Sequence, residues 1–97
     1  MELLDYTPNL MRGGFYGRKR PRTKLEILAE ILLAARTGAT KTEIVYHTNL
    51  NFQRAKRYLV YLEGKGLLEN SGPHYKSTER GNAFLRNVQS MEEILHQ

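Results

Sequence analysis

The chain has 97 residues, enough for one small domain with a modest core and too few for a separate catalytic module. It contains no cysteine, which excludes disulfides, thiolate metal sites and cysteine nucleophiles. No apolar run approaches the roughly 20 residues of a membrane-spanning helix, and the first residues lack the layout of a signal peptide. We therefore expect a cytoplasmic protein with no membrane contact.

The formal net charge is +5, and the excess lies near the beginning of the chain. Six of the 15 lysines and arginines fall within residues 12–24, which contain no acid, and the other nine nearly balance the ten acids. Prolines and glycines interrupt residues 1–22, which indicates a flexible basic arm. Such an arm favours phosphate binding, because counterions are released on contact, and it fits a narrow minor groove. The arm residues expected to contact DNA are Arg18, Lys19, Arg20 and Arg22.

Residues 24–36 have the pattern of a first helix. Thr23 followed by Glu26 predicts a capping box, and Thr37 with Gly38 predicts the stop. The apolar residues cover more than one side, so another helix, from this chain or from a second subunit, is expected to pack on it. These apolar residues are Leu25, Ile27, Leu28, Ile31, Leu32, Ala34 and Ala35.

Residues 40–65 contain two helix starts in succession. Thr40 can cap one helix, residues 49–51 interrupt that helix, and Asn51 can cap the next, since short side-chain oxygens satisfy free amides at a helix start. Two short helices joined by so tight a turn meet at a sharp angle. In the second helix, the residues expected to be buried together are Phe52, Ala55, Leu59 and Leu62.

The opposite face of that second helix is polar and basic. Residues 51–61 include Arg54, Lys56 and Arg57 but no acid. A helix whose other face is buried would present these guanidinium, amide and phenol groups to the major groove of DNA, where they can hydrogen-bond to bases and phosphates. The alternative interpretation is an ordinary helix face exposed to solvent. Lys41 and Thr42, which start the preceding helix, could clamp a phosphate. The predicted contacts of the second helix are Asn51, Gln53, Arg54, Arg57 and Tyr61.

Residues 67–76 predict a strand, a turn at residues 71–73 and a returning strand, which together form the wing of a winged helix-turn-helix domain. His74 and Lys76 are the candidate phosphate contacts of this hairpin. Thr78 then caps a final helix that runs to near the chain end. Spacings of four, three and four residues on that helix predict dimerisation. The residues with this spacing are Phe84, Val88, Met91 and Leu95.

The order of these elements and their amino-acid sequences resemble those of the small archaeal winged-helix DNA-binding proteins that dimerise through a C-terminal antiparallel coiled-coil helix. The resemblance covers about residues 24–85 and is carried by residues 24–28, 41–46 and 66–68 and by Thr78 with Gly81. It implies sequence-tolerant or regulatory DNA binding in an archaeal cell. The chain departs from the family pattern in its shorter C-terminal helix and its longer basic arm.

The predicted fold is mainly α with a small β-hairpin. It is divided into a basic arm at 1–22, a winged helix-turn-helix domain at 23–81 and a dimerisation helix at 78–97. His47, His74 and His96 lack metal-ligand spacing, and no serine, histidine and carboxylate set is present, so we expect no enzyme, metal or cofactor.

The leading hypothesis is a homodimer that binds double-stranded DNA, specifically or semi-specifically. It would act as a transcription regulator or as a chromatin-type protein of the nucleoid. The alternatives are a protein-interaction module of the same fold and RNA binding through the arm.

Overall fold

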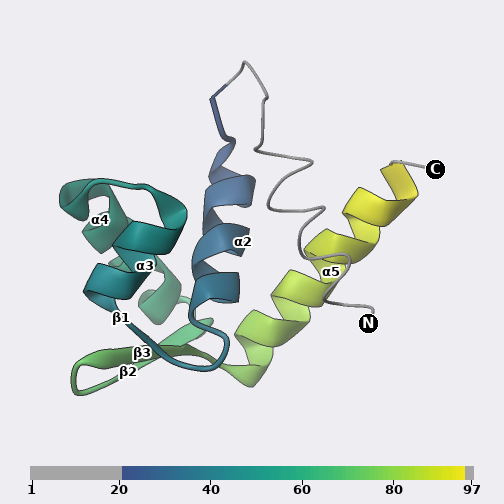
Figure 1. Ribbon diagram of the computed structural model, residues 1–97. Coiled ribbons are helices and arrows are strands. Elements are labelled where there is room, and N and C mark those ends of the chain that lie inside the picture. Colours follow the sequence, from purple (N-terminus) through teal and green to yellow (C-terminus); the bar gives the residue numbers. More distant parts are fainter. Residues whose placement is uncertain (1–20, 96–97) are drawn as a thin grey trace.

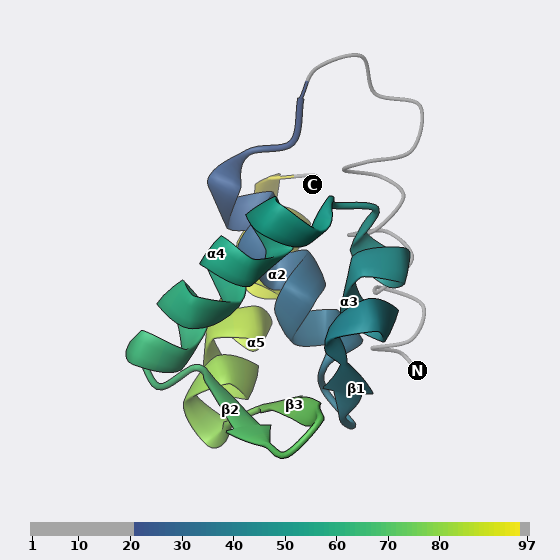
Figure 2. The same cartoon turned by 90° about the vertical axis from the view of Figure 1, so that its left-hand side faces the viewer.

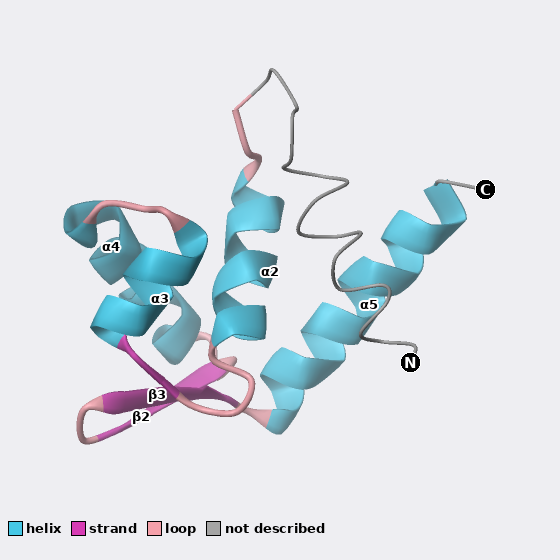
Figure 3. Cartoon of the chain, viewed as in Figure 1, coloured by secondary structure: helices cyan, strands magenta, loops and turns pink. Residues whose placement is uncertain are grey.

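The computed structural model describes residues 21–95, which form four helices and a three-stranded sheet (Figure 1, Figure 3). This is the predicted winged helix-turn-helix architecture, mainly α with a small β component. In chain order the elements are α2 (Lys24–Ala34), β1 (Ala39–Thr40), α3 (Lys41–Thr48), α4 (Phe52–Gly64), β2 (Leu68–Ser71), β3 (His74–Ser77) and α5 (Glu79–Leu95).

Helix α2 begins at the predicted capping box. The Thr23 hydroxyl accepts from the Glu26 amide at 3.1 Å, and the Glu26 carboxylate accepts from the Thr23 amide at 2.8 Å. The helix ends at Ala34, slightly before the predicted end at residue 36. Gly38, with a φ of +104°, then turns the chain into β1, a backbone conformation that a side chain would strain.

Helix α2 is the centre of the molecule and is buried on more than one side, as its wide apolar surface predicts. Residues 27–32 are all buried. One side joins α3 and α4 in the main core, for example through Ile31, Ile44 and Leu59, while Ala29 packs with Leu85 of α5. Figure 1 shows α2 between the α3–α4 pair and α5. The covering helix therefore comes from the same chain. Leu25, predicted to share the apolar stripe, is 41% exposed at the start of the helix.

The sheet contains one strand more than the predicted hairpin. Its order is β1-β3-β2 and all pairs are antiparallel. In the hairpin Ser71 pairs with His74, so that Gly72 and Pro73 form a two-residue loop, and Gly72 has a φ of +66°. The sequence does not predict strand β1, because a strand of two residues is too short to show an alternating pattern. The strand is defined by its pairing with β3.

Ser77 fastens the end of the sheet to α2. Its hydroxyl donates to the Leu32 carbonyl at 2.6 Å and its amide donates to the Ala35 carbonyl at 2.9 Å. Both acceptors lie in the last turn of α2 or just after it, where carbonyls lack partners within a helix. The wing is thereby held to the core at its base.

Thr78 precedes helix α5 and caps it, as predicted. The Thr78 hydroxyl accepts from the Gly81 amide at 3.1 Å and donates to the Gly66 carbonyl at 2.7 Å. A side chain on Gly81 would overlap the Leu67 carbonyl, so this glycine allows α5 to approach the chain before β2. Among the helices of residues 21–95, none is both long and apolar enough to cross a membrane.

Candidate nucleic-acid interface

The turn between α3 and α4 fixes the direction of α4. Asn49 ends α3 in the left-handed conformation, with a φ of +58°, and its amide donates to the Val45 carbonyl at 2.8 Å. Leu50 is 4% exposed and joins the main core. Asn51 caps α4, as predicted, because its side-chain oxygen accepts from the Arg54 amide at 2.7 Å. The two caps and the buried leucine together define the conformation of this turn.

One face of α4 is anchored in the core. Ala55, Leu59 and Leu62 are at most 1% exposed, as their spacing predicts. The prediction that Phe52 is buried with them is wrong, because its side chain is 53% exposed. Phe52 is the first residue of the helix, and none of the other described elements encloses it there.

The opposite side of α4 carries a stripe of exposed residues, called here the outward stripe: Gln53, Arg57, Val60 and Gly64. They follow one another at intervals of four, three and four residues. Each lies two positions from a buried residue, and residues two positions apart point to nearly opposite sides of a helix. Figure 2 shows α3, α4 and the wing on one side of the molecule, with α5 behind. Val60 was not predicted, although it is 60% exposed. The same helical spacing that identifies the buried face could have found it.

Arg54 and Tyr61 lie on a flank of α4 beside the outward stripe. The ammonium of Lys24 lies 4.6 Å from the centre of the Tyr61 ring, and that of Lys65 lies 5.6 Å from it. Both distances are within the range of cation–π attraction. Tyr61 thus holds two cations, one from α2 and one from the end of α4, next to Arg54. Nothing in the sequence pairs Lys24 with a residue so far along the chain.

Arg22, predicted to contact DNA, is instead bonded inside the protein. Its guanidinium donates to the Glu30 carboxylate and to the Thr48 carbonyl, both at 2.6 Å. The side chain of Arg22 is 21% exposed and that of Glu30 is 3% exposed. The arginine thus pairs with a buried carboxylate of α2 and links it to the end of α3. The other predicted arm contacts, Arg18, Lys19 and Arg20, lie outside the described residues.

The start of α3 lies beside the wing. Strand β1 pairs Thr40 with His74, so Lys41 follows directly from a residue opposite the wing strand. Lys41 is half-buried and Thr42 is exposed. The Glu43 carboxylate accepts from the Thr40 amide at 2.9 Å, which places a negative charge at this helix start. That negative charge would repel a phosphate bound at the backbone amides of the helix start. The Lys41 side chain is therefore a stronger candidate for a phosphate contact than these amides.

The outer face of the wing carries His74 and Lys76. Both are exposed, while the alternating residues Tyr75 and Ser77 are half-buried and buried. Lys76 pairs across the strands with Glu69, whose charge partly offsets it. The two-residue loop carries no cation. A phosphate contact of the wing would therefore come from its face, at Lys76 and His74.

The predicted dimerisation residues divide into two sets. Val88 is 7% exposed and packs with Ala29 and Leu85, and Phe84 is half-buried against both apolar clusters of the described chain. Met91 and Leu95 are 49% and 79% exposed. Intrachain packing thus already covers the first two residues, and the exposed apolar surface of α5 is confined to its end.

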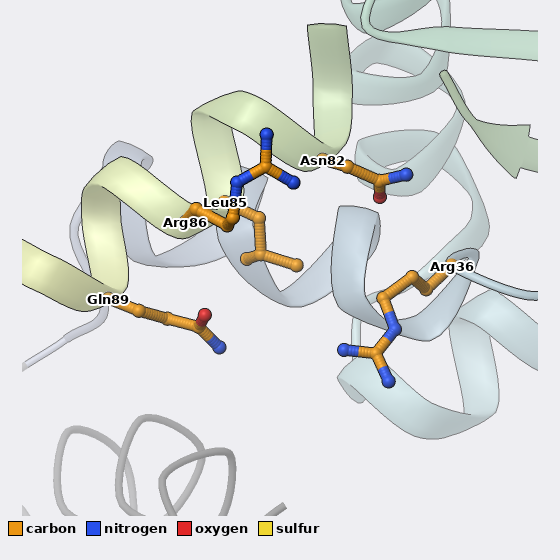
Figure 4. A pocket seen from close by; sticks show the side chains of 5 residues that line it. All are labelled: Arg36, Asn82, Leu85, Arg86 and Gln89. Carbon is orange, nitrogen blue, oxygen red and sulfur yellow. The ribbon is translucent and has the colours of Figure 1, made fainter. Parts of the chain in front are cut away.

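A pocket lies between the end of α2 and α5, where α5 packs on the side of α2 away from α4. Its volume is about 280 Å³ and it is lined by Arg36, Asn82, Leu85, Arg86 and Gln89 (Figure 4). No residue that the sequence predicts to bind DNA lines it. Within residues 21–95, no group of three or more histidine, aspartate or glutamate side chains is placed to hold a metal ion.

Residues 21–96 match the model of the winged helix-turn-helix family, and the chain belongs to this family. Its sequence is 26% identical over 90 residues to the uncharacterized protein MJ0287 of Methanocaldococcus jannaschii, covering 92% of this chain and 93% of that protein. The fold is similar to the crystal structure of Sso10a-2, a DNA-binding protein from Sulfolobus solfataricus. That match has a TM-score of 0.68 at 24% identity and covers 77% of this chain and 83% of the other.

Proposed function

We propose that the chain binds double-stranded DNA, with α4 in the major groove. The outward stripe is the observation that carries this proposal. Gln53 and Arg57 are exposed on the side of α4 directly away from its buried face, and an amide and a guanidinium match the hydrogen-bonding groups of adenine and guanine edges. Membership of the winged helix-turn-helix family and the similarity to the DNA-binding protein Sso10a-2 support it.

Phosphate contacts would come from the cations around the stripe. Lys24 and Lys65 are held at Tyr61, beside Arg54, on one flank of α4. Lys41 adjoins the wing face of His74 and Lys76 through the β1–β3 pair. Such contacts position a protein on the duplex without reading its sequence, and the arm residues Arg18, Lys19 and Arg20 would add further contacts to backbone or minor groove.

The same proposal includes a homodimer paired through the end of α5. Met91, Ile94 and Leu95 are all about half exposed or more, and together they form the free apolar end of this helix. A two-fold pair would present two α4 helices to two half-sites. The dimer would act as a transcription regulator or as a DNA-organising protein of the nucleoid. No catalytic step is assigned to the chain.

The test compares the salt dependence of binding to duplex DNA for two matched variants. Arg54→Ala with Arg57→Ala removes two charges from α4, and Arg36→Ala with Arg86→Ala removes two from the pocket between α2 and α5. We expect the α4 variant to bind roughly 10- to 100-fold more weakly and to flatten the logarithmic salt slope by up to about 2, since each phosphate contact contributes about 0.9. Equal losses in both variants, or none in either, would contradict the proposal.

The arm is tested by a chain that begins at residue 21, which keeps the structural Arg22. If the arm binds phosphates, its removal weakens binding to all duplex sequences alike and lowers the salt slope. A preference for single strands that disappears with the arm would instead support RNA or single-strand binding.

A further inference from the structure

Val60 is an apolar side chain on the proposed DNA-reading face. It lies three residues after Arg57 and seven after Gln53, so all three share the outward stripe. The next residue on the stripe is Gly64, which has no side chain. Val60 is therefore the last side chain that the stripe offers toward the end of α4.

Within residues 21–95, Val60 lies outside the apolar core. Its side chain is 60% exposed, and it joins neither of the apolar clusters of residues 21–95. A β-branched residue also forms helix less readily than lysine, glutamate or alanine, so neither burial nor helix propensity accounts for valine here. An apolar group that covered its two methyl groups would therefore stabilise the contact.

The major groove offers one prominent apolar group, the C5-methyl of thymine. Gln53 and Arg57 would face neighbouring base edges on the same stripe, which brings Val60 to the level of the bases rather than of the phosphates. Phe52, also exposed, lies on the flank of α4 next to Lys56 and not on the stripe. The two apolar residues thus provide a matched pair for experiment.

We propose that Val60 contacts a thymine methyl group, so that the protein prefers duplexes with an A·T pair adjacent to the bases faced by Gln53 and Arg57. This inference rests on the proposed DNA binding and identifies a class of preferred site. A methyl group added to cytosine at the same ring position would serve equally well, because the contact is made to the methyl group.

The test uses duplexes that differ in base methyl groups alone, which requires no known target. Binding is measured to an alternating A·T duplex and to its deoxyuridine counterpart, and to an alternating G·C duplex with and without 5-methylcytosine. For the wild-type chain we expect roughly three- to fivefold weaker binding for each contacted methyl removed and a similar gain for each one added. Val60→Ala should bind the members of each pair equally, whereas Phe52→Ala should keep the wild-type response.

The outcomes separate the two levels of the proposal. If the wild-type chain binds none of the duplexes, DNA binding itself fails, and the assignment of Val60 with it. If it binds them but ignores the methyl groups, the assignment alone is overturned. A methyl response that survives in Val60→Ala, or that is also lost in Phe52→Ala, overturns it as well. Because Val60 is exposed, its substitution is expected to change stability by no more than about 0.5 kcal/mol, and a thermal unfolding curve checks this.

Discussion

Replacing Arg22 with methionine separates a structural role of this residue from a DNA-binding one. The arginine bonds to Glu30 and to the Thr48 carbonyl, both at 2.6 Å. Methionine keeps much of the length and apolar volume of the side chain but donates no hydrogen bond. The substitution therefore removes the ion pair that Arg22 makes with a carboxylate that is 3% exposed. Protein stability should fall, while contacts made by α4 and the wing should remain.

The size of the loss follows from the two bonds and their burial. Removing one partner of a fully buried ion pair costs about 3–5 kcal/mol. The Arg22 side chain is 21% exposed, so water can partly replace it, and we reduce the expected loss to about 2–3 kcal/mol. For a domain of this size, that loss lowers the midpoint of thermal unfolding by roughly 10 °C or more. Replacing Glu30 with methionine as well should restore much of the stability, because the buried carboxylate that Arg22 neutralises is then absent too.

Thermal unfolding followed by circular dichroism measures this effect, and DNA affinity is measured at a temperature where both proteins are folded. Arg36→Met is the matched control, because Arg36 lies in the pocket between α2 and α5, and its stability should change by no more than about 0.5 kcal/mol. A wild-type midpoint for Arg22→Met combined with weakened DNA binding would refute the structural role and return Arg22 to the DNA-contacting arm.

Two further predictions concern the packing and the turn that position α4. Gly81→Ala should destabilise the protein by about 3 kcal/mol, since the new methyl group overlaps the Leu67 carbonyl, whereas Gly64→Ala, with open space around it, should stabilise by up to about 1 kcal/mol in urea unfolding. Similar stabilities for the two glycine variants would show that α5 does not pack as described. Asn51→Ala should lower the free energy of unfolding by about 1 kcal/mol because it removes the cap of α4, while Asn87→Ala, on the exposed side of α5, should not lower it. An Asn51 variant as stable as the wild type would contradict the capping of α4.

The helices and the wing could be predicted because their signals are local. Thr23, Thr40 and Asn51 each precede a helix that they cap, and the spacing of Ala55, Leu59 and Leu62 defines the buried face of α4. Capping and helical periodicity depend on residues within one or two turns, which the sequence displays directly.

The features missed by sequence reasoning depend on contacts between distant residues. Strand β1 exists through its pairing with β3, and Arg22 bonds to groups eight and 26 residues away, so its neighbours in the sequence suggest an arm. The cover of α2 was expected from either subunit, and the fold shows that α5 of the same chain provides it. For Phe52, helical periodicity predicts the direction in which the side chain points. It does not predict whether another element packs against the side chain and buries it.

The most direct test of the central claim is a titration of the isotopically labelled protein with duplex DNA, followed by the backbone amide signals in NMR spectra. If α4 reads the major groove, the largest changes should fall within residues 51–64, with smaller changes around Lys41 and the wing. Residues 82–89, beside the pocket of Arg36 and Arg86, should change little. Large changes at residues 82–89 with none in α4 would contradict the account and place the nucleic acid on the opposite side of the molecule.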